Sequence, residues 1–91
     1  NYFLTIDYIF NYFFKSIPTT YKIDVSLNRK AIELLLFKDD FTKEQIIKVI
    51  DFVALNQELK TKYNRPNLLR KDFKYLFELV KNVDIPPKVI L

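Results

Sequence analysis

The 91-residue chain contains no cysteine, no histidine and no glycine. Without cysteine and histidine it cannot form disulfide bonds, zinc fingers, Cys–His nucleophile pairs or imidazole acid–base centres. Without glycine it cannot form the phosphate-binding loops of P-loop and Rossmann proteins, because those backbones approach the ligand where a Cβ atom would collide. These absences exclude nucleotide-dependent enzymes of those types, and we expect no cofactor. The lack of cysteine fits a protein of the reducing cytoplasm.

The composition is that of one folded helical domain. Hydrophobic residues make up 49% of the chain and charged residues 29%, which provides enough apolar surface for a core. A chain of this length forms a single compact domain, so we expect residues 1–91 to fold as one unit. Because glycine-free chains have few routes to tight hairpin turns, we predict an all-α fold. The sequence begins with Asn1 rather than Met, and a fragment of a longer protein stays an open alternative.

The aromatic N-terminal segment, residues 2–14, does not have the features of a membrane anchor. It contains Asp7 and Asn11, and it is far shorter than the roughly 20 apolar residues that a membrane-spanning helix needs. We therefore expect neither a targeting sequence in this segment nor a membrane partner.

Apolar residues at helical spacing predict a compact bundle of four helices. Pro18 ends the first helix, because its ring cannot continue the hydrogen-bond ladder, and an extended connection follows. Asp24 or Ser26 can cap the second helix. Pro86 and Pro87 predict an extended C-terminal tail after the fourth. The four predicted helices span about residues 5–15, 27–37, 43–58 and 67–82.

The clearest local signal lies at the start of the third helix. Thr42 is the predicted N-cap, and Gln45 closes a capping box with it. Phe41 and Ile46 are spaced for a hydrophobic staple across the same turn. The apolar stripes of the four helices predict a core of Phe3, Ile6, Phe10, Phe13 and Ile17, then Leu27, Ala31, Leu34 and Leu35, then Ile46, Val49, Ile50, Val53 and Ala54, and finally Leu69, Phe73, Leu76, Phe77 and Val80.

Positive charge is concentrated near the end of the chain. The segment from Lys60 to Lys81 has seven cations and two acids, a local formal charge of +5, whereas all other residues sum to −1. Such a basic stripe is typical of a phosphate-binding surface, although the solvent-facing side of an ordinary amphipathic helix can carry the same pattern of charges. Tyrosines among the cations could stack on unpaired bases. The candidate nucleic-acid-binding residues are Lys60, Lys62, Tyr63, Arg65, Arg70, Lys71, Lys74, Tyr75 and Lys81.

The acidic residues do not indicate a metal site or a catalytic pair. Asp39 and Asp40 are adjacent and precede a predicted helix, where the helix dipole favours negative charge. Together with Glu44 they lack the spaced oxygen ligands and the glycine turn of calcium-binding loops. No serine, threonine or tyrosine has a recognisable base partner, so we predict no enzyme activity and no metal.

The run "NRKAIELLLFKDDFTKEQIIKVIDFVALNQELKTKYNRPNLLRKDFKYLFEL" resembles the C-terminal module of phage and plasmid replication initiators and of DnaD-type helicase-loading proteins. The preceding "DYIFNYFFKSIP" resembles the first helix of that module, so the resemblance covers about residues 7–80. The residues that match its pattern are Glu44, Ile47, Val49, Ile50, Asp51 and Phe52, followed by Pro66, Leu69, Arg70, Phe73 and Leu76.

This resemblance implies a non-enzymatic module of DNA replication. It would bind single- or double-stranded DNA without sequence specificity, with the last helix and its tail as the DNA-binding element. It would also contact a replicative helicase or an initiator protein.

The aromatic first helix favours a different class of function. Several of its apolar residues lie off the predicted core stripe, and surface aromatics of this kind are typical anchors of protein interfaces. The alternative hypothesis is therefore a small phage or plasmid protein that binds a groove of a host protein without binding nucleic acid. Under either hypothesis, the apolar first helix also predicts a homo-oligomer or docking on further residues of a longer chain. The candidate protein-interaction residues are Tyr2, Ile9, Tyr12 and Phe14.

Overall fold

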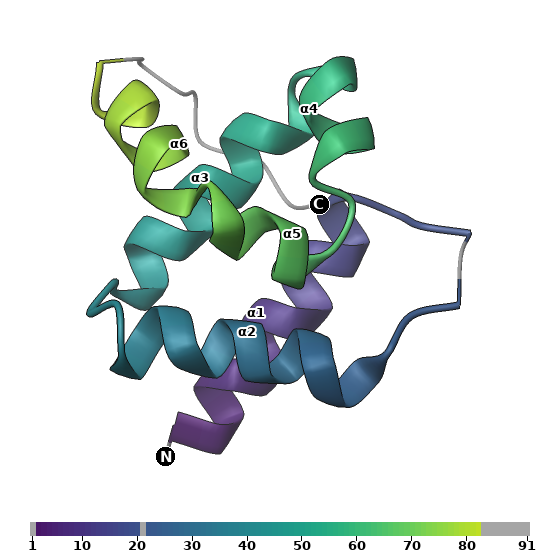
Figure 1. Ribbon diagram of the computed structural model, residues 1–91, viewed down its shortest axis with the longest axis vertical. Helices are drawn as coiled ribbons and strands as arrows, with labels where there is room; N and C mark the ends of the chain where they lie inside the picture. Colours follow the sequence, from purple (N-terminus) through teal and green to yellow (C-terminus); the bar gives the residue numbers. More distant parts are fainter. Residues whose placement is uncertain (1, 21, 83–91) are drawn as a thin grey trace, which may run out of the picture.

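The computed structural model describes residues 2–20 and 22–82, and these residues form helices and connections without any strand. The prediction of an all-α fold is confirmed, but the prediction of four helices is wrong. The predicted third helix ends early at Ala54, a short additional helix forms in the segment between the predicted third and fourth helices, and the predicted fourth helix is divided in two (Figure 1). The predicted proline-rich tail lies outside the described residues. The six helices are α1 Tyr2–Ser16, α2 Val25–Phe37, α3 Lys43–Ala54, α4 Gln57–Lys62, α5 Pro66–Lys71 and α6 Phe73–Lys81.

Both interruptions occur at a short polar residue whose side chain has another partner. Asn56 ends the run of α3 and caps α4, where its Oδ1 accepts a hydrogen bond of 3.1 Å from the amide of Leu59. Asp72 separates α5 from α6, and its carboxylate accepts a hydrogen bond from the hydroxyl of Tyr63. Asn and Asp disfavour helix interiors because their side chains compete for hydrogen bonds. The apolar period continues across Asp72, from Leu69 to Phe73 and Leu76, which is why periodicity alone does not reveal that break. α4 buries no residue, so it has no apolar stripe that could predict it.

The predicted N-caps of α2 and α3 are confirmed. Asp24 accepts a hydrogen bond of 2.9 Å from the amide of Leu27. Thr42 accepts from the amide of Gln45 at 3.1 Å, and the amide of Thr42 donates to the Gln45 side chain at 2.8 Å, which completes the capping box. These caps fix where both helices begin.

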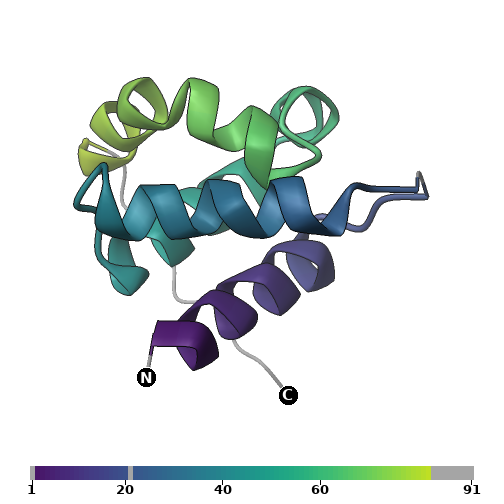
Figure 2. The same ribbon diagram turned by 60° about the horizontal axis from the view of Figure 1, so that its bottom comes forward.

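The helices are stacked in layers. Figure 2 shows α1 on one side of α2 and the α5–α6 pair on the other. In agreement with this view, α1 packs on α2 and α3, α5 packs on α2, and α6 packs on α3. Residues of α1 and residues of α5–α6 therefore face opposite sides of the molecule.

The core lies between these layers and differs from the prediction mainly in α1 and α2. Phe3 and Leu27, which were predicted to be buried, are exposed, whereas Ile9 and Ile32 are fully buried. α1 contacts two helices, so the face that it buries is wider than one stripe and rotated from the predicted one. The buried apolar residues are Ile6, Ile9, Tyr12, Phe13, Ile17, Ala31, Ile32, Leu35, Ile46, Val49, Ile50, Val53, Tyr63, Leu69, Phe73, Leu76 and Val80.

Candidate nucleic-acid interface

The outward side of α5 and α6 carries exposed lysines beside an exposed aromatic ring. Lys71 and Lys74 are exposed, and neither forms an ion pair within the described residues. Tyr75 follows directly and is 64% exposed. The opposite side of these helices is buried in the core, so they are held flat against α2 and α3. We call Lys71, Lys74 and Tyr75 the α5–α6 face.

The start of α5 is fixed by a buried asparagine of α2. The Oδ1 of Asn28 accepts a hydrogen bond of 2.9 Å from the amide of Asn67, and its Nδ2 donates to the carbonyl of Asp24 at 2.8 Å. Arg65, the N-cap residue of α5, makes no side-chain capping hydrogen bond. Asn28 therefore satisfies one of the unpaired amides at the start of α5 from a neighbouring helix.

Arg70 is not available as a simple phosphate ligand, because it is engaged with a carboxylate. Its Nε and Nη2 donate to the two carboxylate oxygens of Asp39 at 2.8 and 3.1 Å, a forked arrangement that is among the stronger ion-pair geometries. Asp39 belongs to the connection between α2 and α3. There Asp40 adopts a left-handed φ of 60°, which aspartate tolerates better than most residues with a Cβ. The pair joins α5 to this connection.

Lys81 is also engaged. Its Nζ lies 3.2 Å from a carboxylate oxygen of Glu78 and 4.9 Å from the centroid of the Phe77 ring. Both contacts are on the surface, where ion pairs are weak, so a phosphate could compete for this ammonium.

The remaining predicted cations lie on α4 and the connection that follows it. Lys62 and Arg65 are exposed, whereas Lys60 is half-buried beside a polar depression that also includes Thr20 and Asn64. Figure 1 shows α4 and α6 on either side of α5. The predicted cations thus form two groups rather than one continuous stripe.

The prediction that Tyr63 stacks on bases is wrong, because this residue belongs to the core. Its side chain is 3% exposed, and its hydroxyl donates a hydrogen bond of 2.6 Å to Asp72. Burial, followed by this hydrogen bond, raises the pKa of Tyr63 above its usual value of 10. A ring held in this way cannot present a face to nucleic acid.

An aromatic groove adjoins the α5–α6 face. It is an open cavity of about 630 Å³. The rings of Phe41, Phe73 and Phe77 meet there, with centroids 4.5 Å apart for Phe41 and Phe73 and 5.4 Å apart for Phe41 and Phe77. Sequence reasoning missed this groove because Phe41 comes from a distant connection and was assigned to a staple. The residues that line the aromatic groove are Asp39, Phe41, Arg70, Lys71, Phe73, Lys74, Phe77 and Glu78.

Among the predicted protein-interaction residues of α1, the side chain of Tyr2 lies outside the described part of the structure, and the other three are placed differently from the prediction. Ile9 and Tyr12 are 1% and 9% exposed, so the prediction that they form an exposed interaction surface is wrong. The Tyr12 hydroxyl donates a hydrogen bond to Asp51 of α3, and burial raises the pKa of Tyr12. Phe14 is half-buried and packs against the core with Phe10. The buried face of α1 is wide enough to include these residues.

Other apolar residues of α1 reach the surface instead. Leu4 is 67% exposed, Phe3 and Tyr8 are also exposed, and the Nζ of Lys43 lies 4.0 Å from the centroid of the Tyr8 ring. We call Phe3, Leu4 and Tyr8 the α1 patch.

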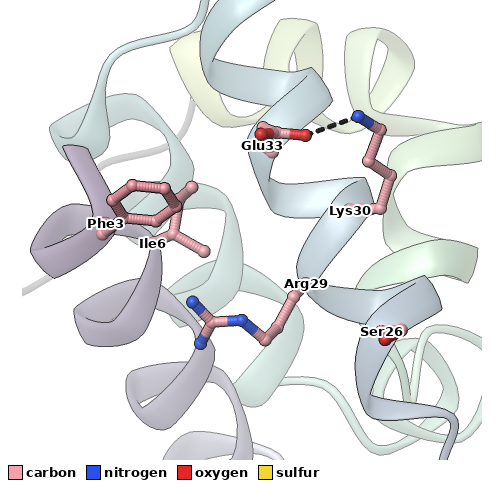
Figure 3. Close-up of a pocket in the computed structure, with 6 residues that line it drawn as sticks. All are labelled: Phe3, Ile6, Ser26, Arg29, Lys30 and Glu33. Atoms are coloured by element: carbon pink, nitrogen blue, oxygen red, sulfur yellow. Dashed lines mark hydrogen bonds and ion pairs between the residues drawn. The ribbon is translucent and has the colours of Figure 1, made fainter.

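A small cavity of about 230 Å³ separates the start of α1 from α2 (Figure 3). Phe3 and Ile6 line its α1 side, and Arg29 extends toward it from α2 while pairing with Asp7 of α1. The cavity is shallow and its charged groups are paired, Arg29 with Asp7 and Lys30 with Glu33, so it does not resemble a small-molecule site.

The described part of the chain has neither a metal site nor a membrane-spanning helix. Residues 2–20 and 22–82 contain no group of acidic side chains that could hold a metal ion. None of their helices is long and apolar enough to cross a membrane.

Comparisons with protein-family models, with curated proteins and with solved structures found no match to this chain. The resemblance to replication initiators and helicase-loading proteins therefore stays a prediction.

Proposed function

We propose that this chain is a non-enzymatic DNA-binding module that holds the phosphate backbone on its α5–α6 face. The observation that supports it best is the pair of exposed lysines, Lys71 and Lys74, which have no carboxylate partner within the described residues. Tyr75, which follows Lys74 in the sequence, is also exposed. Unpaired lysines attract phosphates, and an exposed aromatic ring offers a stacking surface to a base.

The distribution of charge supports the same surface. Residues 57–82, which comprise α4 to α6, contain seven of the fifteen cations and three of the eleven acids, so their formal charge of +4 equals that of the whole chain. The two ion pairs that involve Arg70 and Lys81 reduce the available charge but leave Lys71, Lys74, Lys62 and Arg65. A basic layer of this kind would attract a polyanion without reading its sequence.

The resemblance noted in the sequence extends this proposal to DNA replication. In that case the molecule would hold DNA on one side and contact a replicative helicase or an initiator protein with another. The α1 patch is the surface best suited to such a protein contact, because it is exposed and apolar and belongs to α1, which lies on the other side of α2 from α5 and α6 (Figure 2).

The test compares two variants that remove the same amount of charge. Replacing Lys71 and Lys74 with Gln should weaken binding to a DNA oligonucleotide at least about tenfold at low salt, because two phosphate contacts are lost. The matched control replaces Lys15 and Lys48, two exposed lysines of α1 and α3, with Gln. Fluorescence anisotropy measures both dissociation constants. Absence of DNA binding by the unmodified chain, or equal losses in the two variants, would refute the proposal.

The second candidate function is protein binding without nucleic acid, and the α1 patch favours it. Leu4 and Tyr8 are one helical turn apart and exposed, and exposed aromatic and leucine side chains are typical interface anchors. Under this alternative, a partner or a second copy of the chain covers α1, and its affinity depends little on salt.

A further inference from the structure

We infer that the aromatic groove receives an unpaired base of a single-stranded nucleic acid whose phosphates lie on Lys71 and Lys74. This inference rests on the proposed function and specifies which form of nucleic acid the site takes. Lys71 and Lys74 line the groove themselves, so a phosphate held by either ammonium would place its own base or the next one at the groove.

The floor of the groove suits a flat apolar ring. Phe41 and Phe77 are half-buried and retain part of their surface, whereas Phe73 lies buried beneath them. The Phe41 ring is tilted by 57° from Phe73 and meets Phe77 edge-on at 68°, while Phe73 and Phe77 are nearly parallel, so the three rings form an aromatic cluster to which another ring can add. The volume of about 630 Å³ falls within the usual range of ligand pockets and leaves room for a base.

The charges around the groove are compatible with phosphate. Its two carboxylates are both engaged, Asp39 with Arg70 and Glu78 with Lys81. The exposed ring of Tyr75 offers a second stacking surface for the next base along the strand.

A paired duplex cannot use these features in the same way. Its bases are stacked inside the helix, and a base enters a protein pocket only after it is unpaired and flipped out, which costs free energy. In a single strand the bases are already accessible. The cluster of rings therefore favours single-stranded nucleic acid, whereas the lysines alone would hold either form.

The experiment measures fluorescence anisotropy of a labelled 12-nucleotide single strand and of the duplex with the same sequence. We expect the single strand to bind at least about tenfold more tightly. Phe77→Leu should weaken single-strand binding about five- to tenfold and leave duplex binding unchanged, because leucine keeps an apolar side chain but removes the ring.

The matched control is Phe52→Leu. Phe52 is also a half-buried phenylalanine that packs against the core, but it does not line the groove. This variant should bind both forms as the unmodified chain does. Thermal unfolding followed by circular dichroism confirms that each variant is folded, and Phe41→Leu replaces Phe77→Leu if the latter does not fold.

The outcomes separate the inference from the proposed function. Equal affinity for single strand and duplex, with no effect of Phe77→Leu or Phe41→Leu, would overturn the inference while the lysine variant still supports DNA binding. No binding to either form would overturn both. The competing ligand is a glutamate-rich peptide that contains one phenylalanine. If this peptide binds the unmodified chain as tightly as the single strand does, and Phe77→Leu weakens both by the same factor, the groove binds an acidic protein segment. The inference would then be wrong.

Discussion

Individual polar side chains hold the helices of this protein in register. Asn28 joins the starts of α2 and α5, the carboxylate of Asp72 receives the hydroxyl of Tyr63, and Asp39 receives the guanidinium of Arg70. Asn28 is the most buried of these side chains, with 1% of its surface exposed. Because buried polar groups must be hydrogen-bonded, each partner constrains where the other can lie. These contacts set the position of the α5–α6 face.

Replacing Asn28 with Ala should lower the free energy of unfolding by about 1–3 kcal/mol, because the amide of Asn67 would stay buried without an acceptor. Urea denaturation followed by circular dichroism measures this change. Asn11→Ala is the control, since Asn11 is exposed on α1 and its replacement should change stability by less than about 0.5 kcal/mol. Equal stability of the two variants would show that the Asn28 bridge does not stabilise the fold.

At the level of the helices, caps and breaks determine where each helix begins and ends, and the apolar stripes determine which side of it is buried. α3 begins at its capping box and ends at Ala54, and Asn56 then caps the short, polar helix α4. α5 and α6 are divided at Asp72. The division lets the chain turn at both points and cover α2 and α3 from one side.

Thr42→Ala should cost about 1 kcal/mol of stability, because the amide of Gln45 loses its side-chain acceptor at the exposed start of α3. Thr42→Ser is the control, since serine retains the hydroxyl and should be nearly as stable as the unmodified chain. Chemical denaturation gives both values, and a loss of the same size in Thr42→Ser would contradict the assignment of this stability to the cap.

At the scale of the whole molecule, the two candidate surfaces are separated by the middle layer. α1 lies on the other side of α2 from α5 and α6 (Figure 2), and it packs mainly on α2 and α3. The α1 patch and the α5–α6 face therefore belong to different layers of the molecule. Changes in distant groups without shared partners are usually additive. The two surfaces should therefore act independently.

Replacing Leu4 and Tyr8 with Ser should leave the dissociation constant for DNA unchanged within about twofold, because neither residue lies near the cations of α4 to α6. The same variant should lower any self-association of the chain, which analytical ultracentrifugation measures, and this self-association should respond little to salt. The variant in which Gln replaces Lys71 and Lys74 should instead bind DNA more weakly and self-associate as the unmodified chain does. Loss of DNA binding in the α1 variant would indicate that binding requires an oligomer formed through α1.

The sequence by itself determined the features that depend on neighbouring residues. The all-α class follows from helical spacing of apolar residues, and the caps at Asp24 and Thr42 follow from side chains that reach amides three residues away. The core stripes of α3 and α6 were also largely predictable, because each of these helices buries one narrow face: Val49 and Leu76 are fully buried, as predicted.

Tertiary structure decided which of the candidate site residues remain accessible. Arg70 and Tyr63 look like surface residues in the sequence, but Asp39 and Asp72 engage them after the helices pack. The aromatic groove exists only because the connection before α3 brings Phe41 onto α6. Such contacts join residues that are distant in the chain, and no local period or motif encodes them, because they arise when separate apolar faces are buried together.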